Sequence, residues 1–140
     1  MANVKILLIV DTKNINRRNI EKNISFLDNT KFMEIIPATD YKTMIDAGSM
    51  VEWSGAPLDP STFDCVSIDS IAIEKRSGSV DLFGIPVLVG SGGTIQATVL
   101  AHETGGRDEV YTLRFTVIKD KDGSTTSYKI DPQIRVKPQQ

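Results

Sequence analysis

The sequence contains one cysteine and one histidine in 140 residues. The single cysteine, Cys65, cannot form an intramolecular disulfide, which excludes a small secreted scaffold held together by disulfides. We expect Cys65 to be buried as a small hydrophobic side chain, since it lies in a strand-like stretch. The single histidine, His102, is the only candidate base for a serine triad, and no Gly-x-Ser-x-Gly elbow is present. A zinc site needs three or four protein ligands, and one cysteine and one histidine far apart in the sequence give it little support.

The chain has no excess of basic residues and no long apolar run. Its 16 Lys and Arg face 18 Asp and Glu, and the net charge is −2, so nucleic-acid binding has no electrostatic support. No apolar run approaches the roughly 20 residues of a membrane helix. The run from Ile6 to Val10 is too short for a signal-peptide core, and no small-residue cleavage site follows it. We therefore expect a cytoplasmic protein without a membrane partner, with export that needs no cleaved signal as the alternative.

The stretch from Glu109 to Val136 gives the clearest structural pattern. Its apolar residues fall on alternate positions, which is typical of a strand with one buried face; they are Tyr111, Leu113, Phe115 and Val117. The sequence from Asp120 to Gly123 follows, and an Asp-Gly pair between alternating strands predicts a hairpin. Asp131-Pro132 predicts a break after the returning strand, because proline lacks the backbone donor.

Further short strands are predicted along the rest of the chain. They lie within Val4–Val10, Phe32–Ala38, Met50–Ser54, Phe63–Glu74, Leu82–Val89 and Thr94–Ala101. The first of these is apolar almost throughout, as expected for a strand buried on both faces or central in a sandwich. Within Phe63–Glu74 the apolar phase slips near Asp69-Ser70, which predicts a β-bulge. We expect Lys13–Thr30 to be a long loop with one or two helical turns, and Thr39–Ala47 to be a linker.

These patterns predict an all-β fold. We expect an antiparallel β-sandwich, jelly-roll-like, with about eight or nine short strands and at most one short helical segment. The length suits a single domain over residues 1–140, with 136–140 as a frayed tail.

A few polar and aromatic residues are candidates for binding. Asp120, Asp122 and Asp131 supply oxygens around one hairpin, but the EF-hand pattern fails, since Gly is missing at the sixth position and the twelfth is not Glu. A solvated turn is the simpler interpretation, with calcium as the alternative. Trp53 is expected to anchor the interior; the alternative is that Trp53 or Tyr111 stacks against a sugar. Arg17, Arg18 and Lys22 could contact an anion. The simpler interpretation is that they lie on a solvated face.

Three segments resemble one known family. Ile6–Thr12 is similar to the I-L-x-V-I-D-T opening of the PixA/AidA family of bacterial inclusion body proteins. Gly48–Gly55 is similar to its G-D-x-V-x-W/F-x-G segment, and Tyr128–Val136 is similar to its closing pattern, aromatic-x-x-D-P-x-I-x-V. The order and spacing suit the whole chain. The chain departs at Ser49, where the family tends to have Asp, and its four methionines do not suggest a methionine store.

The resemblance implies a small bacterial β-sandwich that is packed into cytoplasmic inclusions or tied to quorum-sensing-controlled traits. It implies no catalytic residues, so none is assigned, and we expect neither a cofactor nor a resident metal. The function that follows is a non-enzymatic, self-associating protein, a homodimer or larger homo-oligomer. The alternatives are a small ligand- or glycan-binding module, assisted by calcium at Asp120 and Asp122, and a hydrolase that uses His102.

Overall fold

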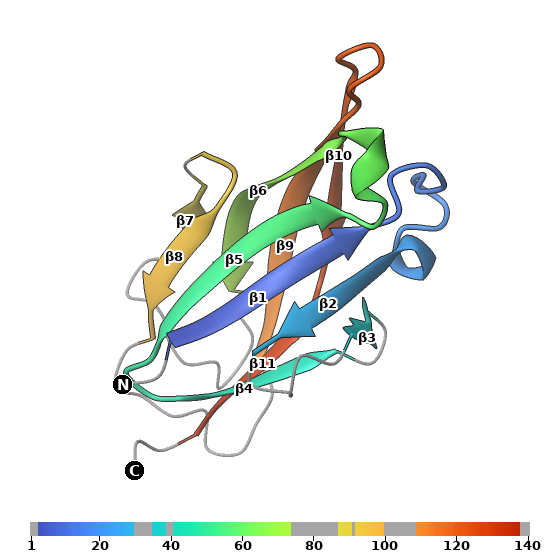
Figure 1. Ribbon diagram of the computed structural model, residues 1–140. Coiled ribbons are helices and arrows are strands. Elements are labelled where there is room, and N and C mark those ends of the chain that lie inside the picture. The colour runs from blue at the N-terminus through green and yellow to red at the C-terminus, as the bar shows by residue number, and fades with distance from the viewer. Residues whose placement is uncertain are drawn as a thin grey trace.

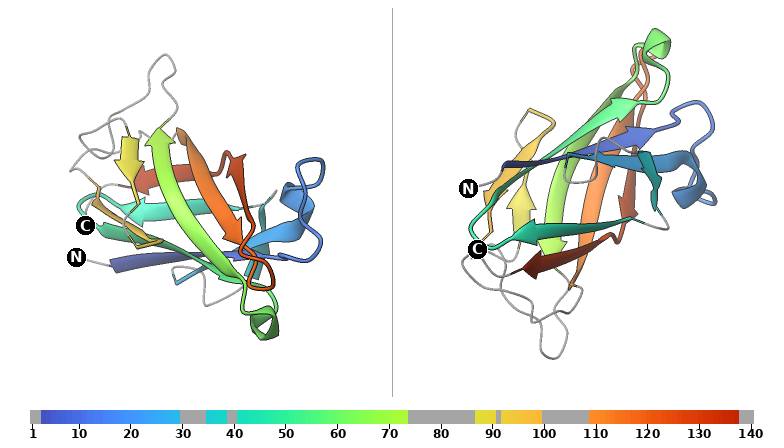
Figure 2. Two further views of the ribbon diagram at one scale, coloured as in Figure 1. Left: turned by 90° about the horizontal axis from the view of Figure 1, so that it is seen from above. Right: turned by 60° about the horizontal axis from the view of Figure 1, so that its bottom comes forward.

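Two facing β-sheets make up the molecule (Figures 1 and 2). A computed structural model describes residues 3–29, 35–38, 41–73, 87–90, 92–99 and 109–137. The first sheet has the strand order β3 (Ile35–Pro37), β2 (Ile24–Asp28), β1 (Asn3–Val10), β5 (Met50–Pro57) and β8 (Ile95–Thr98). The second has the order β4 (Lys42–Asp46), β11 (Gln133–Lys137), β9 (Glu109–Ile118), β6 (Cys65–Ile73) and β7 (Val87–Val89), with β10 (Thr125–Ile130) paired to β9. The prediction of an all-β sandwich is confirmed.

The described residues hold eleven strands, more than the eight or nine expected. One additional strand, β2, lies in the predicted loop Lys13–Thr30, and another, β4, lies in the predicted linker Thr39–Ala47. Both were missed because their surroundings are polar, whereas pairing with β1 and with β11 fixes them as strands. Helical structure in the described ranges is limited to short 3-10 turns, η1 (Glu21–Asn23), η3 (Pro60–Thr62) and a 3-10 residue at Ala38 after β3. None of this helical structure is long and apolar enough to span a bilayer.

Both sheets are mixed, although antiparallel pairing was expected throughout. β1 runs parallel to β5, and β11 runs parallel to β4, while the other pairings are antiparallel. Parallel neighbours need a long connection, and each of these pairs is joined through several other strands. Alternation along one strand does not reveal the direction of its neighbour, so the sequence did not indicate the parallel pairs.

The hairpin and the bulge are confirmed. β9 and β10 pair in register from Leu113 to Ile118, and Gly123 in the connecting loop has a φ of 68°, the left-handed conformation that glycine adopts without strain. The pairing of β6 with β9 shifts between Ile68 and Ser70, which leaves Asp69 as the additional residue. The predicted break at Asp131-Pro132 separates β10 from β11.

The core lies between the two sheets and is mainly aliphatic, with aromatic side chains among its largest members. Its largest fully buried side chains include Trp53, Tyr111, Phe26 and Phe115. The Trp53 and Tyr111 rings meet edge to face with centroids 6.0 Å apart, and Phe26 stacks on Tyr41 at 4.2 Å. Such pairs add to the stabilisation from burial of apolar area.

β1 is central in its sheet but is not buried on both faces. Ile6 and Leu8 point into the core, whereas Leu7 and Ile9 are half-buried on the outer face of the first sheet. An apolar strand thus keeps part of its apolar surface on the outside of the sandwich.

Candidate functional site

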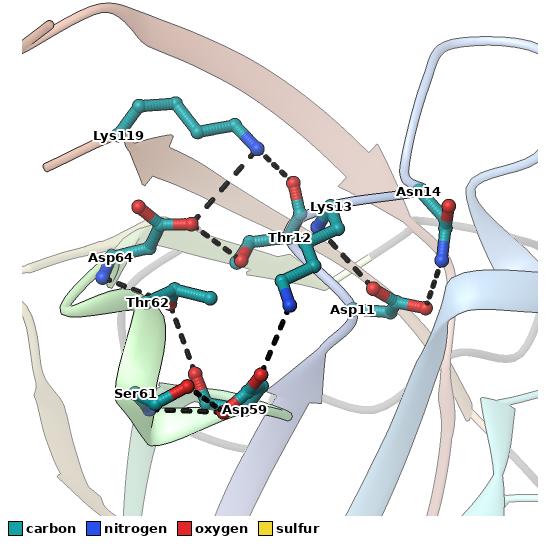
Figure 3. A network of polar contacts seen from close by, with 9 residues as sticks. All are labelled: Asp11, Thr12, Lys13, Asn14, Asp59, Ser61, Thr62, Asp64 and Lys119. Atoms are coloured by element: carbon teal, nitrogen blue, oxygen red, sulfur yellow. Dashed lines mark hydrogen bonds and ion pairs between the residues drawn. The ribbon is translucent and has the colours of Figure 1, made fainter. Parts of the chain in front are cut away.

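Three separate segments of the chain meet in a polar network at one end of the sandwich (Figure 3). They are the residues after β1, the connection between β5 and β6 that contains η3, and the start of the β9–β10 loop (Figure 1). The strands bring these segments together because β1 pairs with β5 in the first sheet and β6 pairs with β9 in the second. This network is the first candidate for a functional site.

Asp64 is the centre of the network and is nearly buried. Its Oδ2 accepts a hydrogen bond from the Thr12 hydroxyl at 2.6 Å, and its Oδ1 accepts one from the Asp120 backbone N–H at 2.9 Å. Lys119 Nζ lies 3.9 Å from Oδ2 and also donates to the Thr12 carbonyl. The Thr12 hydroxyl, then the Asp120 N–H, and then the Lys119 charge lower the pKa of Asp64. A carboxylate held in this way is a poor general base.

Asp59 fastens the loop that contains η3. Its Oδ1 accepts from the Ser61 backbone N–H at 3.0 Å and from the Ser61 hydroxyl at 2.6 Å, as an N-cap does. Lys13 Nζ lies 3.1 Å from its Oδ2. The Ser61 hydroxyl, followed by the contact with Lys13, lowers the pKa of Asp59 to about 2. Asp59 is thus an ionised cap for η3.

Asp11 caps the turn that follows β1. Its Oδ2 accepts from Asn14 Nδ2 at 2.8 Å and its Oδ1 accepts from the Lys13 backbone N–H at 3.3 Å. Asp11 and Thr12 close the opening segment of the family resemblance, and both are held by local or network hydrogen bonds. Each carboxylate in Figure 3 accepts hydrogen bonds from nearby donors. The network therefore holds these loops together and has a structural role.

A second polar group lies within the core. Tyr41 donates to Asp28 Oδ2 at 2.7 Å and accepts a short hydrogen bond from the Thr43 hydroxyl, and all three residues are buried. Burial, followed by the charge field of Tyr111 and Asp28, raises the pKa of Tyr41 well above its ordinary value. The tyrosine therefore stays neutral, and its O–H donates a hydrogen bond to Asp28.

The aromatic candidates for sugar stacking do not reach the surface. Trp53 is 1% exposed and Tyr111 is fully buried, and Trp53 Nε1 donates to the Tyr111 hydroxyl at 3.4 Å. The expectation that Trp53 anchors the interior is confirmed, and the alternative of a stacking surface at Trp53 or Tyr111 is wrong. Alternation along β5 and β9 turns both rings to the inner face, where they meet across the sandwich.

The aspartates proposed for calcium do not converge. Asp122 Oδ1 accepts from the Ser124 backbone N–H at 2.9 Å, which is the main cause of its lowered pKa. Asp131 accepts from the Thr112 hydroxyl at 3.0 Å at the far end of the six-residue strand β10. A strand of that length separates it from the loop by roughly 20 Å. Within the described ranges, no group of three or more His, Cys, Asp or Glu side chains could hold a metal ion.

The remaining chemical candidates are Cys65 and His102. The prediction that Cys65 is buried is wrong: the thiol is exposed, because Val66 and Ile68 take the inward positions at the start of β6. Cys65 lines a cleft of about 470 Å³ together with Gly92 and Gly93. His102 lies outside the described residues.

Two surface hollows were not foreseen from the sequence. One, of about 380 Å³, opens on the outer face of the first sheet; half of its ten lining residues are apolar, among them Ile9, Ile35 and Leu58. The other, of about 480 Å³, opens near the outer face of the second sheet and is lined by Arg17, Arg114 and Lys129 among others. The only sequence signals were the apolar run Ile6–Val10 within β1 and the Arg17-Arg18 pair.

The other two segments of the resemblance also have structural roles. Gly48 turns the chain with a φ of 85°, and Ser49, which is buried, accepts a backbone hydrogen bond from Val99 at 2.8 Å. A Cβ on Gly55 would lie 2.5 Å from Val66 Cγ1, so glycine permits the close approach of β5 and β6. Near the end of the chain, Pro132 accepts from the Tyr111 N–H at 3.0 Å. These contacts fix the path of the backbone, and none of them presents a reactive side chain to a ligand.

Comparison with known proteins gives a family and a fold. A family model described as "Domain of unknown function (DUF8788)" matches residues 2–135. No curated protein matches the sequence. Among solved structures, the crystal structure of an inclusion body protein, PixA, from Burkholderia cenocepacia J2315 has a similar fold. The TM-score is 0.63 with 16% identity, over 96% of this chain and 95% of that one. The likeness extends over nearly the whole sandwich, and at this identity it establishes the shared fold.

Proposed function

The chain belongs to the DUF8788 family, a domain of unknown function, and we propose that it is a non-enzymatic protein of the inclusion-body kind that associates with copies of itself. The proposal depends on one observation, the apolar outer face of the first sheet. We define this apolar outer face by two rows of residues that point away from the core, together with Leu58 of the hollow; the rows are Leu7, Leu27 and Ile35, and Ile9, Ser25 and Pro37.

The apolar outer face is continuous across three strands. In one row, Ile35 on β3 pairs with Leu27 on β2, which pairs with Leu7 on β1. The next row brings Pro37, Ser25 and Ile9 together in the same way. Ile35 is 58% exposed and Leu58 is 57% exposed, and both line the hollow of about 380 Å³. A rimmed apolar patch of this kind on a domain surface marks an interaction site.

A second copy of the chain is the occupant that this face fits. Its rim carries charges of both signs: Asp11 and Glu21 are acidic, and Lys22 is basic. A twofold interface places the same patch on both sides, so a rim with both signs complements itself. A strongly charged partner such as a nucleic acid would require a rim of one sign.

The fold supports the same proposal. The solved structure that shares it is described as an inclusion body protein, and we extend that description to this chain. We accordingly propose a cytoplasmic location, with the protein packed in inclusions. The three segments that resemble the PixA/AidA family lie at structural positions of this shared sandwich, which supports kinship with that family.

We propose no catalytic activity. The carboxylates of the polar network hold backbone and hydroxyl donors, and their lowered pKa values keep them ionised and weakly basic. His102 is the remaining candidate base. His102→Ala is expected to leave any hydrolysis of ester and glycoside panels at the background level of the wild type. A specific activity that disappears with His102→Ala would establish the hydrolase alternative instead.

Light scattering coupled to size-exclusion chromatography tests the self-association. The mass of the wild type is expected to exceed that of one chain and to grow over about a hundredfold range of protein concentration, because association depends on concentration. Addition of calcium or of a chelator is expected to leave the mass unchanged. A single-chain mass at every concentration would overturn the proposal.

A matched pair of variants connects the association to the apolar outer face. Leu58→Lys places a charge in the hollow, and it is expected to shift the distribution toward single chains. Phe63→Lys is the control, since Phe63 is 74% exposed and lies in the same connection between β5 and β6 without lining the hollow. Equal effects of the two variants would show that general surface apolarity, and not this face, drives the association.

A further inference from the structure

The second hollow has a different character from the apolar outer face. It measures about 480 Å³ and is lined by three cationic side chains from separate segments: Arg17 follows β1, Arg114 lies on β9 and Lys129 lies on β10. Ser127 and Asp69 complete its polar lining. We call it the cationic hollow.

Two of its cations are placed against each other by the strand register. Arg114 and Lys129 are directly opposed residues of the β9–β10 pair, and both are exposed. Like charges at opposed positions destabilise a sheet. Arg17 adds a third positive charge to the same hollow. Within the described part of the chain, no ion pair joins any of the three to a carboxylate.

The one acid of the cationic hollow does not neutralise it. Asp69 is the additional residue of the β-bulge, and its Oδ2 accepts from the Thr116 hydroxyl at 2.5 Å while its Oδ1 accepts from the Ser67 hydroxyl at 3.3 Å. Its carboxylate is thus turned toward hydroxyl groups of β6 and β9. With three cations and one acid, the hollow keeps an excess of two positive charges.

We propose that the cationic hollow binds a small, multiply charged oxyanion of the phosphate or carboxylate class. Arginine supplies planar, forked donors to such oxygens and lysine supplies a point charge. An anion between Arg114 and Lys129 removes their mutual repulsion, so ligand binding also stabilises the β9–β10 hairpin. The hollow opens near the second sheet, so the inference does not depend on association through the first.

Calorimetric titration with pyrophosphate and with citrate tests the proposal, each at constant ionic strength set with sodium chloride. Pyrophosphate represents the phosphates and citrate the carboxylates, so their relative affinities distinguish the two sources. Saturable binding of at least one of them is expected, together with a melting temperature that rises with ligand concentration. No saturable heat with either, or a melting shift that chloride reproduces, would overturn the inference.

Variants locate the site. Lys129→Gln and Arg114→Gln are each expected to weaken binding at least about tenfold, and Arg17→Gln to weaken it as well. Matched controls are Arg18→Gln, next to Arg17, and Lys121→Gln, on the hairpin loop; both residues are exposed and neither lines the hollow. The controls are expected to change the affinity by less than about twofold, since neither side chain lines the hollow and exposed charges in water interact weakly. Equal losses in variants and controls would contradict the assignment.

A second readout does not need the anion. Without ligand, Lys129→Gln is expected to raise the melting temperature, because it removes the like-charge pair with Arg114. Lys121→Gln removes a lysine without removing that pair and is expected to leave the melting temperature unchanged. A fall in the melting temperature of Lys129→Gln would show that the lysine stabilises the hairpin and would contradict the repulsion on which the inference depends.

Discussion

At the scale of single residues, the aspartates of this protein act as fasteners. Asp59 holds η3, Asp64 joins the residues after β1 to the β9–β10 loop, and Asp122 holds the turn of that loop. Each accepts hydrogen bonds in its ionised form, which favours that form and lowers its pKa. These aspartates therefore contribute to the stability of the fold, and we assign them no catalytic role.

These carboxylates make the stability depend on acid. An unfolded aspartate titrates near a pKa of about 3.9, whereas the folded pKa of Asp59 is about 2 and those of Asp64 and Asp122 are also lowered. As the pH falls through this interval, the unfolded chain takes up more protons than the folded one and stability is lost.

Thermal unfolding measured at a series of pH values checks this. The melting temperature is expected to fall steadily as the pH decreases from about 5 to about 2, and to be nearly level just above that range. Asp59→Asn is expected to have a shallower acid slope than the wild type. A wild-type melting temperature that stays constant through the acid range would contradict the account.

Tyr41 provides a test of the buried polar group. Tyr41→Phe removes the hydroxyl that donates to the buried Asp28 and accepts from Thr43. The loss of such a donor is expected to lower the free energy of unfolding by about 1–3 kcal/mol, as measured by urea titration. Tyr128→Phe is the control, since Tyr128 packs on Phe115 and its hydroxyl has no hydrogen bond in the described part of the chain. Equal losses from the two variants would refute a special role for Tyr41.

At the scale of strands and turns, local patterns could be predicted and distant pairings could not. The β9–β10 hairpin and the bulge at Asp69 follow from the turn sequence and the slip in alternation, which are contained in short windows. β2 and β4 were missed because their polar neighbours resemble loops, and only their partners β1 and β11 make them strands. The parallel direction of β5 and β4 likewise depends on partners far along the chain.

The candidate sites were less predictable for the same reason. The polar network joins residues that are far apart in the sequence. Thr12 bonds to Asp64, 52 positions further on, and to Lys119, 107 positions further on. Trp53 was foreseen as an interior anchor because a large aromatic in a short strand favours burial, but its partner Tyr111 was not. No spacing in the sequence indicated either surface hollow.

The loop of the hairpin offers a test at this scale. Gly123 has a φ of 68°, and a Cβ there would meet no atom within 4 Å, so only backbone strain opposes a side chain. Gly123→Ala is expected to cost about 1–2 kcal/mol in the free energy of unfolding. Gly123→Asn is expected to cost less, because asparagine tolerates the left-handed conformation better. Chemical denaturation of both variants checks the order; an alanine variant as stable as the wild type would contradict the geometry.

At the scale of the whole molecule, the two outer faces of the sandwich differ. The first sheet carries the apolar outer face across β1, β2 and β3, and the cationic hollow opens near β9 and β10 of the second. Association through one face leaves the other open. In a packed assembly of such molecules, the cationic hollows would stay accessible to solvent and to anions. Self-association and anion binding can therefore be tested separately.

The central claim is that copies of the chain associate through the apolar outer face. Sedimentation equilibrium of Ile35→Lys and Val89→Lys tests it most directly, because Ile35 on β3 and Val89 on β7 are exposed β-branched residues on three-residue edge strands of opposite sheets. The association constant is expected to fall at least about tenfold for Ile35→Lys, since a charge replaces a contact in the apolar interface. It is expected to be unchanged for Val89→Lys. A wild-type constant retained by Ile35→Lys, or lost equally in both variants, would contradict the claim.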